Sequence, residues 1–208
     1  GGGRGIGAMT SKTLAASGAA TIVVDIEADR AEATVGEIRA NGGTAEAIVA
    51  DLFDTKQVET LVRTTVDTFG RVDILANVAG GAFAYVEFRR MAEWSEDEFD
   101  LIQTRNLRYI FVICKAVIKQ MLAQGTGGSI VNVASISGVV SAPNHAPYGA
   151  AKAGLIQLTK TIALEYGREG IRGNAVSPGS IYTPATSEGR DRNLSRYRKI
   201  VPIGRVGQ

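Results

Sequence analysis

The stretch Gly1-Gly-Gly-Arg-Gly-Ile-Gly7, followed by Ala8-Met-Thr-Ser-Lys-Thr-Leu-Ala-Ala16, predicts a tight turn into the amino-terminus of a helix. Glycines let the backbone approach a bound group closely, and the amides and dipole of a helix amino-terminus attract negative charge. Such a turn is suited to hold a pyrophosphate. Because short glycine patterns also occur in flexible leader segments, this interpretation needs support from the rest of the chain.

That support comes from an acid at the end of the next apolar segment. Ala20-Thr-Ile-Val-Val-Asp25 is typical of a buried strand, and Asp25 follows the glycine run at about the 20-residue spacing of dinucleotide sites. A carboxylate there can bind the adenosine ribose hydroxyls. It would also repel the additional phosphate of NADP, so the sequence favours NAD as the cofactor. Arg4, within the glycine run, instead favours NADP, because its guanidinium can pair with that phosphate.

Strand-like and helix-like segments alternate along the whole chain, which is typical of βα units around a parallel sheet. The capping box Ser95-Glu-Asp-Glu98 begins the longest predicted helix. The predicted strands are 20–25, 44–50, 72–76, 129–134 and 171–176, and the predicted helices are 8–16, 28–40, 54–69, 95–124 and 148–167. We therefore expect an α/β fold with a single open, doubly wound, Rossmann-type parallel sheet and helices on both faces.

The length and the two ends bear on domain organisation. At 208 residues, of which 45% are hydrophobic and 21% charged, the chain suffices for one well-buried domain. No strand leads into Gly1, and the chain stops in the loop Ile203-Gly-Arg-Val-Gly-Gln208. We expect residues 1–208 to form a single domain that lacks its first strand and its carboxyl-terminal end.

Composition argues against several classes of partner. A formal net charge of +2 is too small to indicate nucleic acid or an anionic membrane surface. No apolar run has membrane-spanning length, and no signal-peptide pattern is present. Cys114 is the only cysteine, so an intrachain disulfide is impossible and a buried thiol is expected. These features favour a cytoplasmic protein.

Tyr148 and Lys152 are four residues apart in Pro147-Tyr-Gly-Ala-Ala-Lys152, thirteen residues after Ser135. On a helix, side chains at this spacing share a face, so the ammonium can stabilise the phenolate. Lowering a phenol pKa from about 10 by about 3 units takes roughly 4 kcal/mol. One ammonium at about 4 Å supplies this much at an effective dielectric near 20. The pair therefore indicates a tyrosine that exchanges a proton with an alcohol or ketone near neutral pH.

Together these motifs resemble the short-chain dehydrogenase/reductase family along essentially the whole chain. The resemblance implies four catalytic residues. Ser135 would hold the substrate oxygen, Tyr148 would exchange the proton, Lys152 would lower the tyrosine pKa and bind the nicotinamide ribose, and Asn106 would hold a water that links Lys152 to solvent. It also implies a homo-oligomer, a tetramer or dimer joined through the helices of Asn106 and Tyr148, and no metal.

The resemblance further implies a set of cofactor contacts at the ends of the predicted strands. They are Gly1, Arg4, Gly5, Ile6, Gly7, Asp25, Ile26, Asp51, Leu52, Asn77, Ala79, Gly80, Tyr148, Lys152, Pro178, Gly179, Ile181 and Thr183. Val78 departs from the family pattern, which has a second asparagine there, but Asn77 is kept. The implied activity is the NAD-dependent interconversion of a secondary alcohol, cyclic or hydrophobic, and its ketone.

Several alternatives remain at this level. Ser137 is a rival to Ser135, and the only histidine, His145, lies near enough to Tyr148 in sequence to touch a substrate. Arg4 and a basic cluster within 190–199 motivate an NADPH-dependent 3-oxoacyl thioester reductase, and a non-catalytic dinucleotide-binding regulatory protein is the alternative from another class.

Residues expected to line an apolar substrate pocket are Phe83, Tyr85, Trp94, Ala142 and Tyr182.

Overall fold

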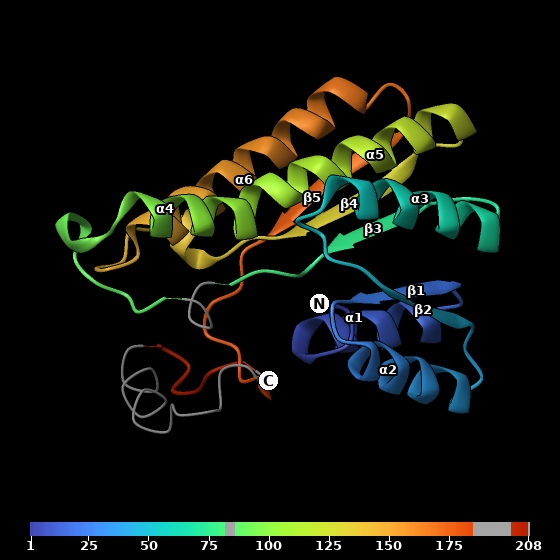
Figure 1. The fold of residues 1–208 in the computed structure, drawn as a ribbon, viewed down its shortest axis with the longest axis horizontal. Helices are drawn as coiled ribbons and strands as arrows, with labels where there is room; N and C mark the ends of the chain where they lie inside the picture. The colour runs from blue at the N-terminus through green and yellow to red at the C-terminus, as the bar shows by residue number, and fades with distance from the viewer. Residues whose placement is uncertain (82–85, 185–200, 208) are drawn as a thin grey trace.

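Helices and strands alternate along the chain in the predicted order (Figure 1). The computed structural model describes residues 1–81, 86–184 and 201–207. Its strands are β1 (Thr21–Asp25), β2 (Ala45–Val49), β3 (Ile74–Asn77), β4 (Gly128–Val133) and β5 (Ile171–Val176). Its α-helices are α1 (Gly5–Ala16), α2 (Ala28–Ala40), α3 (Thr55–Phe69), α4 (Glu96–Gln103), α5 (Tyr109–Gln124) and α6 (Ala146–Tyr166).

Local capping explains why the helices begin and end where they do. Asp54 accepts a hydrogen bond from the Lys56 amide at 2.8 Å at the start of α3, and Gly70, with a φ of 79°, ends that helix. The predicted capping box is confirmed: the Glu98 amide donates to Ser95 Oγ at 3.2 Å, and the Ser95 amide donates to Glu98 Oε2 at 3.0 Å. α1 differs from prediction, since it begins within the glycine run at Gly5.

The predicted long helix over 95–124 is interrupted by one wider turn. α4 and α5 are joined by a π-helical segment, η2 (Thr104–Arg108), in which Asn106 is completely buried. π-helical turns within longer helices are often found at functional sites because they redirect a side chain or a carbonyl. Here the wider turn places Asn106 against the loop that follows β3, where its amide is bound.

All paired strands are parallel, and the Rossmann-type α/β fold predicted from the sequence is confirmed. Helices α1 and α2 lie on one side of the strands, and α3, α5 and α6 lie on the other (Figure 1). The described strands form two ladders where the sequence predicted a single sheet. β1 pairs with β2, and β3, β4 and β5 form a separate ladder, because no described strand lies between β1 and β3.

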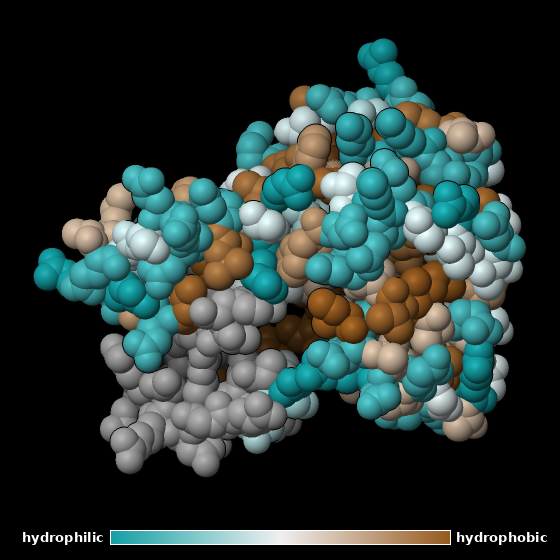
Figure 2. All heavy atoms as spheres, in the orientation of Figure 1, coloured by the Kyte–Doolittle hydropathy of each residue, from teal (hydrophilic) through white to brown (hydrophobic). Residues whose placement is uncertain are grey.

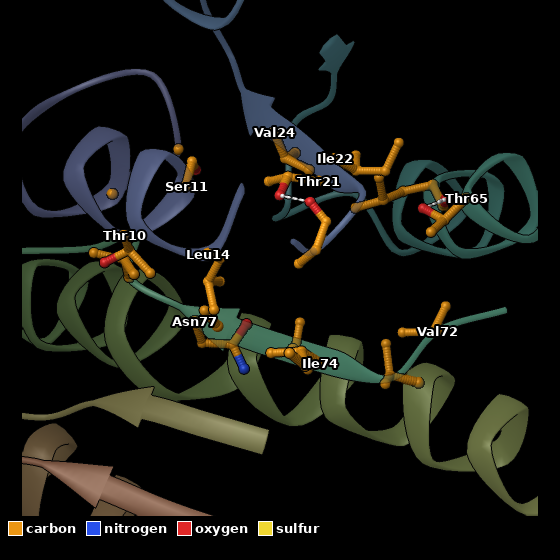
Figure 3. A pocket seen from close by; sticks show the side chains of 18 of the residues that line it. Thr10, Ser11, Leu14, Thr21, Ile22, Val24, Thr65, Val72, Ile74 and Asn77 are labelled. Atoms are coloured by element: carbon orange, nitrogen blue, oxygen red, sulfur yellow. Dashed lines mark hydrogen bonds between the residues drawn. The ribbon is translucent and has the colours of Figure 1, made fainter. Parts of the chain in front are cut away.

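A cavity of about 610 Å³ occupies the space between the two ladders. Leu14, Ile22 and Val24 line it from one half of the molecule, and Val72 and Ile74 line it from the other (Figure 3). Figure 2 shows hydrophobic residues exposed along this boundary. None of the four predicted catalytic residues lines the cavity, so it is a gap within the sheet and not the substrate site.

Each half of the molecule has its own hydrophobic core. The smaller core lies between α1, α2, β1 and β2, with Val23 and Val35 at its centre. The larger core joins α3, α5 and α6 to β4 and includes Tyr109 and Leu155. Cys114 lies in this larger core, as expected, and burial raises the pKa of its thiol to about 12, so it stays protonated.

Candidate active site

Ser135 lies just beyond the carboxyl end of β4, where the chain enters a short 3₁₀ helix, η3 (Ile136–Gly138). Its Oγ caps η3 by accepting a hydrogen bond from the Ser137 amide at 3.2 Å. A side chain at Gly138 would place its Cβ 2.6 Å from the carbonyl carbon of Lys152, so glycine is needed for η3 to pack directly on α6. Ser135 is therefore held next to the helix that carries Tyr148 and Lys152.

Tyr148 and Lys152 lie in the first turns of α6, with the Lys152 Nζ 5.8 Å from the centroid of the Tyr148 ring. Lys152 is only 3% exposed, and its Nζ donates a hydrogen bond to the carbonyl of Val133 at 2.8 Å. Since Val133 ends β4, this bond ties α6 to the strand end that precedes Ser135. The Ser135 hydroxyl lies close enough to the Tyr148 phenol to favour its ionised form. The structure thus brings these three predicted catalytic residues together.

Burial is the main influence on the pKa values of this pair. It lowers the pKa of Lys152 to about 8, so the ammonium can exchange its proton close to neutral pH. Burial also raises the pKa of Tyr148, and the nearby Ser135 hydroxyl offsets this only in part. The predicted lowering of the Tyr148 pKa by Lys152 is therefore not seen here, because the Lys152 Nζ is bound to Val133 and desolvation of the phenolate dominates.

The Asn106 side chain clamps the loop that follows β3. Its Oδ1 accepts a hydrogen bond from the Gly81 amide at 2.9 Å, and its Nδ2 donates to the carbonyls of Gly81 and Ile102, both at 3.0 Å. Both amide hydrogens are thereby bound to main-chain oxygens. The water-binding role predicted for Asn106 therefore does not rest on its Nδ2, which instead fixes the turn containing the predicted cofactor residue Gly80.

The glycine run turns into α1 as predicted, and it is packed too tightly for larger residues. A side chain at Gly7 would overlap the carbonyl oxygen of Gly1. The Gly3 amide donates to Asp25 Oδ2 at 3.1 Å, and the Glu27 amide donates to Asp25 Oδ1 at 3.2 Å. Asp25 is only 4% exposed, so in this structure its carboxylate holds the glycine turn against β1. Its contact with a ribose stays a prediction.

The surroundings of this turn fit the adenosine end of a dinucleotide. Ile26, next to Asp25, is 56% exposed and offers an apolar surface beside the turn. Asp51 Oδ1 accepts a hydrogen bond from the Phe53 amide at 2.9 Å and so shapes the loop after β2, while Leu52 packs against the larger core. Close glycine packing, a helix amino-terminus and an exposed apolar side chain are the features such a ligand needs.

Asn77, at the end of β3, belongs to a buried chain of polar side chains. Its Nδ2 donates to Asn132 Oδ1 at 2.8 Å, Asn132 Nδ2 donates to Thr159 Oγ1 at 2.8 Å, and Thr159 donates to the Leu155 carbonyl at 2.7 Å. Asn132 and Thr159 were not predicted from the sequence. The asparagine within the apolar run 130–133 could have indicated such a chain, because a buried amide needs hydrogen-bond partners.

The segment after β5 connects the two parts of the site. The Ile136 amide donates to the Pro178 carbonyl at 3.0 Å, which places this segment beside Ser135. Further along, Thr183 lies against the glycine turn, where a Cβ at Gly5 would be 3.3 Å from the Thr183 Cβ. Between these points Ile181 forms a β-bridge with Gly207. The predicted cofactor residues of 178–183 therefore span the distance from the catalytic side chains to the glycine turn.

Aromatic residues lie near Tyr148. Phe88 lies 4.3 Å from His145 and 6.3 Å from both Tyr148 and Trp94, measured between ring centroids. Tyr182, another predicted pocket residue, is 49% exposed. Phe88 was not predicted from the sequence, although it lies in the loop assigned there to the substrate. Phe83, Tyr85 and the basic cluster of Arg190, Arg192, Arg196, Arg198 and Lys199 lie outside the described residues.

Two further properties of the described residues concern metals and membranes. Among residues 1–81, 86–184 and 201–207, no group of histidine, cysteine, aspartate and glutamate side chains could hold a metal ion. No helix in these same ranges is long and apolar enough to cross a membrane.

A parallel α/β fold with a glycine turn at one strand end, and Ser135, Tyr148 and a buried Lys152 at another, defines an NAD(P)-dependent oxidoreductase. Comparison with known proteins agrees. Residues 1–194 match the family model described as short chain dehydrogenase, and the chain belongs to this family.

Individual relatives cover nearly the whole chain. A 3-oxoacyl-[acyl-carrier-protein] reductase from Synechocystis sp. is 39% identical over 206 residues, which are 99% of this chain and 80% of that protein. A 2,5-dichloro-2,5-cyclohexadiene-1,4-diol dehydrogenase from Sphingobium indicum is 38% identical over 211 residues, 100% of this chain and 82% of its own. Among solved structures, a single-residue variant of actinorhodin polyketide ketoreductase with NADPH superposes with a TM-score of 0.91 at 31% identity, covering 100% of this chain and 83% of that one.

Proposed function

We propose that this protein is an NAD-dependent dehydrogenase that interconverts a secondary alcohol, cyclic or hydrophobic, and its ketone. One observation carries the proposal: Lys152 is buried, with its Nζ 5.8 Å from the centroid of the Tyr148 ring and bound to the Val133 carbonyl, at the strand end that leads into Ser135. This arrangement offers a substrate oxygen one hydroxyl that orients it and one that exchanges its proton.

The roles of the side chains follow from their positions. In oxidation, Ser135 donates a hydrogen bond to the substrate oxygen and Tyr148 takes the alcohol proton as the carbonyl forms. The nicotinamide coenzyme supplies the hydride acceptor when bound. Lys152, with a pKa of about 8, stabilises the tyrosine when it loses its own proton and can pass a proton toward solvent. Asn106 keeps the Gly80–Gly81 turn in place beside this centre.

Support for NAD comes from Asp25. Its buried carboxylate sits at the end of β1 against the glycine turn, where the additional phosphate of NADP would meet a like charge. The residues proposed to hold the adenosine and pyrophosphate are those of the glycine turn with Asp25, Ile26, Asp51 and Leu52. Those proposed for the nicotinamide end are Asn77, Ala79, Gly80, Pro178, Gly179, Ile181 and Thr183, with Tyr148 and Lys152.

An apolar substrate is supported by the side chains around Ser135. Ile136, Val139 and Val140 are 44%, 61% and 54% exposed, and the Phe88 ring centroid lies 6.3 Å from that of Tyr148. Exposed apolar residues grouped at the mouth of a site favour a ligand with an apolar body. A cyclic alcohol is consistent with the relative named for a cyclohexadiene diol.

The test is a screen of secondary alcohols and ketones, followed by NADH absorbance. We expect oxidation of cyclic alcohols with NAD and a loss of about 10²–10⁴-fold in kcat/KM for Tyr148→Phe, the range typical of a removed general acid or base. Unchanged turnover in Tyr148→Phe would refute the assignment. If the protein bound NAD, turned over no alcohol or ketone and kept every other property in Tyr148→Phe, a regulatory dinucleotide-binding role would replace catalysis.

A second candidate is an NADPH-dependent reductase of 3-oxoacyl thioesters. Arg4 within the glycine turn and the similarity to the Synechocystis reductase favour it. Initial rates with NADH and NADPH discriminate the two candidates. A strong preference for NADPH, together with turnover of an acetoacetyl thioester, would favour the reductase over the alcohol dehydrogenase.

We also propose that residues 1–208 act as one catalytic domain within a homo-oligomer, a tetramer or dimer. Leu164 on α6 is 86% exposed, and Phe111 and Leu122 on α5 are 50% and 41% exposed. Large apolar side chains on two neighbouring helices favour burial against a second copy. Sedimentation velocity of the wild-type protein and of Leu164→Glu tests this, since a monomeric wild type would refute it.

A further inference from the structure

A second polar pair lies beside the proposed proton-exchange centre. Ser137 Oγ and His145 Nδ1 are 3.2 Å apart, and both side chains are half-buried. Ser137 also donates its amide to Ser135 Oγ, and the His145 ring centroid is 6.5 Å from that of Tyr148. The proton exchange proposed above uses Ser135, Tyr148 and Lys152 and leaves this pair without a part in it.

The position of His145 is strongly constrained. The preceding residue, Asn144, has a φ of 67° and is the only non-glycine residue with a positive φ among the described residues. Asparagine tolerates this backbone conformation better than most residues, and such outliers gather at functional sites. The turn at Asn144 presents His145 at the start of α6, where Phe88 packs edge to face on its ring at 4.3 Å.

Phe88 is in turn held by its neighbours. Trp94 lies 6.3 Å from Phe88, and its Nε1 donates a hydrogen bond to the Arg89 carbonyl at 2.9 Å. The Arg89 guanidinium stands 5.7 Å over the Trp94 ring and forms an ion pair with Glu98 at 3.0 Å. His145 therefore contacts Ser137 on one side and Phe88, which packs near Trp94, on the other. Its ring has little freedom to turn.

The pair is set within an apolar surface. Ile136 precedes Ser137, and Val139 and Val140 follow it, all exposed at the same end of the molecule. A hydroxyl and an imidazole in such a surface lower its affinity for a wholly apolar ligand, because both groups must give up water when the ligand covers them. A ligand that presents its own oxygen to the pair avoids this loss.

We infer that Ser137 and His145 determine specificity by binding a second oxygen of the substrate, so that the enzyme favours cyclic diols and hydroxyketones over simple cyclic alcohols. This inference rests on the proposed function, since it places the first oxygen between Ser135 and Tyr148. Phe88 contributes the flat surface against which the ring of the substrate lies. The pair orients the substrate and takes no part in the proton transfer.

The expected discrimination is moderate. Sites whose buried polar groups lose every partner reject a ligand that lacks the matching group by about 10⁴–10⁵-fold. Ser137 and His145 are half-buried and bond each other when the second oxygen is absent, so a smaller preference of about 10–100-fold is expected for the best diol over the simple alcohol.

The experiment measures kcat/KM with NAD for cyclohexanol and for the 1,2-, 1,3- and 1,4-cyclohexanediols. Wild type is compared with His145→Phe, which retains a ring against Phe88, with Ser137→Ala, and with His145→Gln, which retains a hydrogen-bonding group. We expect at least one diol to exceed cyclohexanol by about tenfold or more in wild type. His145→Phe and Ser137→Ala should reduce that ratio about tenfold with cyclohexanol itself changed less than about twofold, and His145→Gln should recover part of it.

The outcomes separate this inference from the proposed function. Equal losses on cyclohexanol and the diols in both variants would show a merely structural pair and overturn the inference, as would a wild type that prefers no diol. Both of these results leave an active, Tyr148-dependent alcohol dehydrogenase. Absence of any secondary alcohol turnover in wild type would overturn the proposed function and this inference together.

Discussion

The two ladders of the sheet serve different parts of the site and are built differently. In the smaller half, β1 and β2 pack with α1 and α2 on a core of small side chains such as Ala15, Val23 and Ala31. Its candidate ligand residue, Asp25, is held through main-chain amides. In the larger half, the four predicted catalytic residues adjoin a core that includes Tyr109 and Met121.

This difference between the halves shows why the reactive side chains lie in the larger one. A buried ammonium and a buried amide need partners and rigid surroundings, and α5 and α6 supply both for Lys152 and Asn106. Binding of a phosphate needs mainly close backbone approach, which glycines supply without a large core. Three experiments test this division of roles between the halves.

The largest expected effect concerns Lys152 in the larger half. Lys152→Met should lower kcat/KM by about 10³-fold, because Tyr148 loses its cation. Burial lowers the Lys152 pKa from 10.5 to about 8, so the unfolded chain binds this proton more tightly. The resulting penalty on folding, about 3 kcal/mol, is complete below pH 8 and fades as pH rises toward 10.5. Allowing for the lost bond to Val133, the variant should be about 2 kcal/mol more stable at pH 7.

Urea unfolding at pH 7 and pH 10 measures the change in the free energy of unfolding, and steady-state kinetics measure the change in kcat/KM. Lys160→Met, which changes an exposed lysine on the same helix, should alter neither property. A Lys152→Met protein less stable than wild type at pH 7 would contradict the prediction.

In the smaller half, Asp25→Asn should change coenzyme choice. The amide keeps an acceptor for the Gly3 or Glu27 main chain but removes the charge that opposes an additional phosphate. We expect the ratio of kcat/KM for NADPH over NADH to rise about 100-fold, since a like-charge contact costs several kcal/mol. Asp29→Asn, at an exposed position in the first turn of α2, is the control and should leave the ratio unchanged. An unaltered ratio in Asp25→Asn would remove the argument for NAD.

The smallest expected effect tests the buried polar chain of the larger half. Thr159 and Thr161 both donate to the carbonyl four residues earlier on α6, but only Thr159 also accepts from Asn132. Thr159→Ala should destabilise the protein by about 2 kcal/mol, or about 4–8 °C in Tm. Thr161→Ala should cost less than about 0.5 kcal/mol. Similar losses in both variants would show that the Asn132 amide finds another partner.

Much of the fold was predictable because it depends on local periodicity. The bounds of α2 and β5 agree with the predicted ranges, and the cap at Ser95 was visible in four consecutive residues. The break at Thr104–Arg108 was not predictable, since a π-helical turn arises from what the helix packs against and not from helical propensity.

Within the candidate site, spacing along one helix predicted that Tyr148 and Lys152 would lie together. It did not predict the direction of the Tyr148 pKa, because burial depends on residues from other elements. Likewise, Phe88 is part of the site because its ring packs on His145. The loop that carries Phe88 has no sequence motif from which this contact could be predicted.

The sequence by itself therefore determined the α/β class, the glycine turn, the family and the identity of the reactive side chains. Each of these can be recognised from short motifs or from local periodicity. Tertiary structure alone decided that Asp25 binds the glycine turn, that Asn106 clamps Gly81 and that Lys152 is anchored to Val133. These features depend on contacts between segments distant in the chain, and on how far each charged or polar group is removed from water.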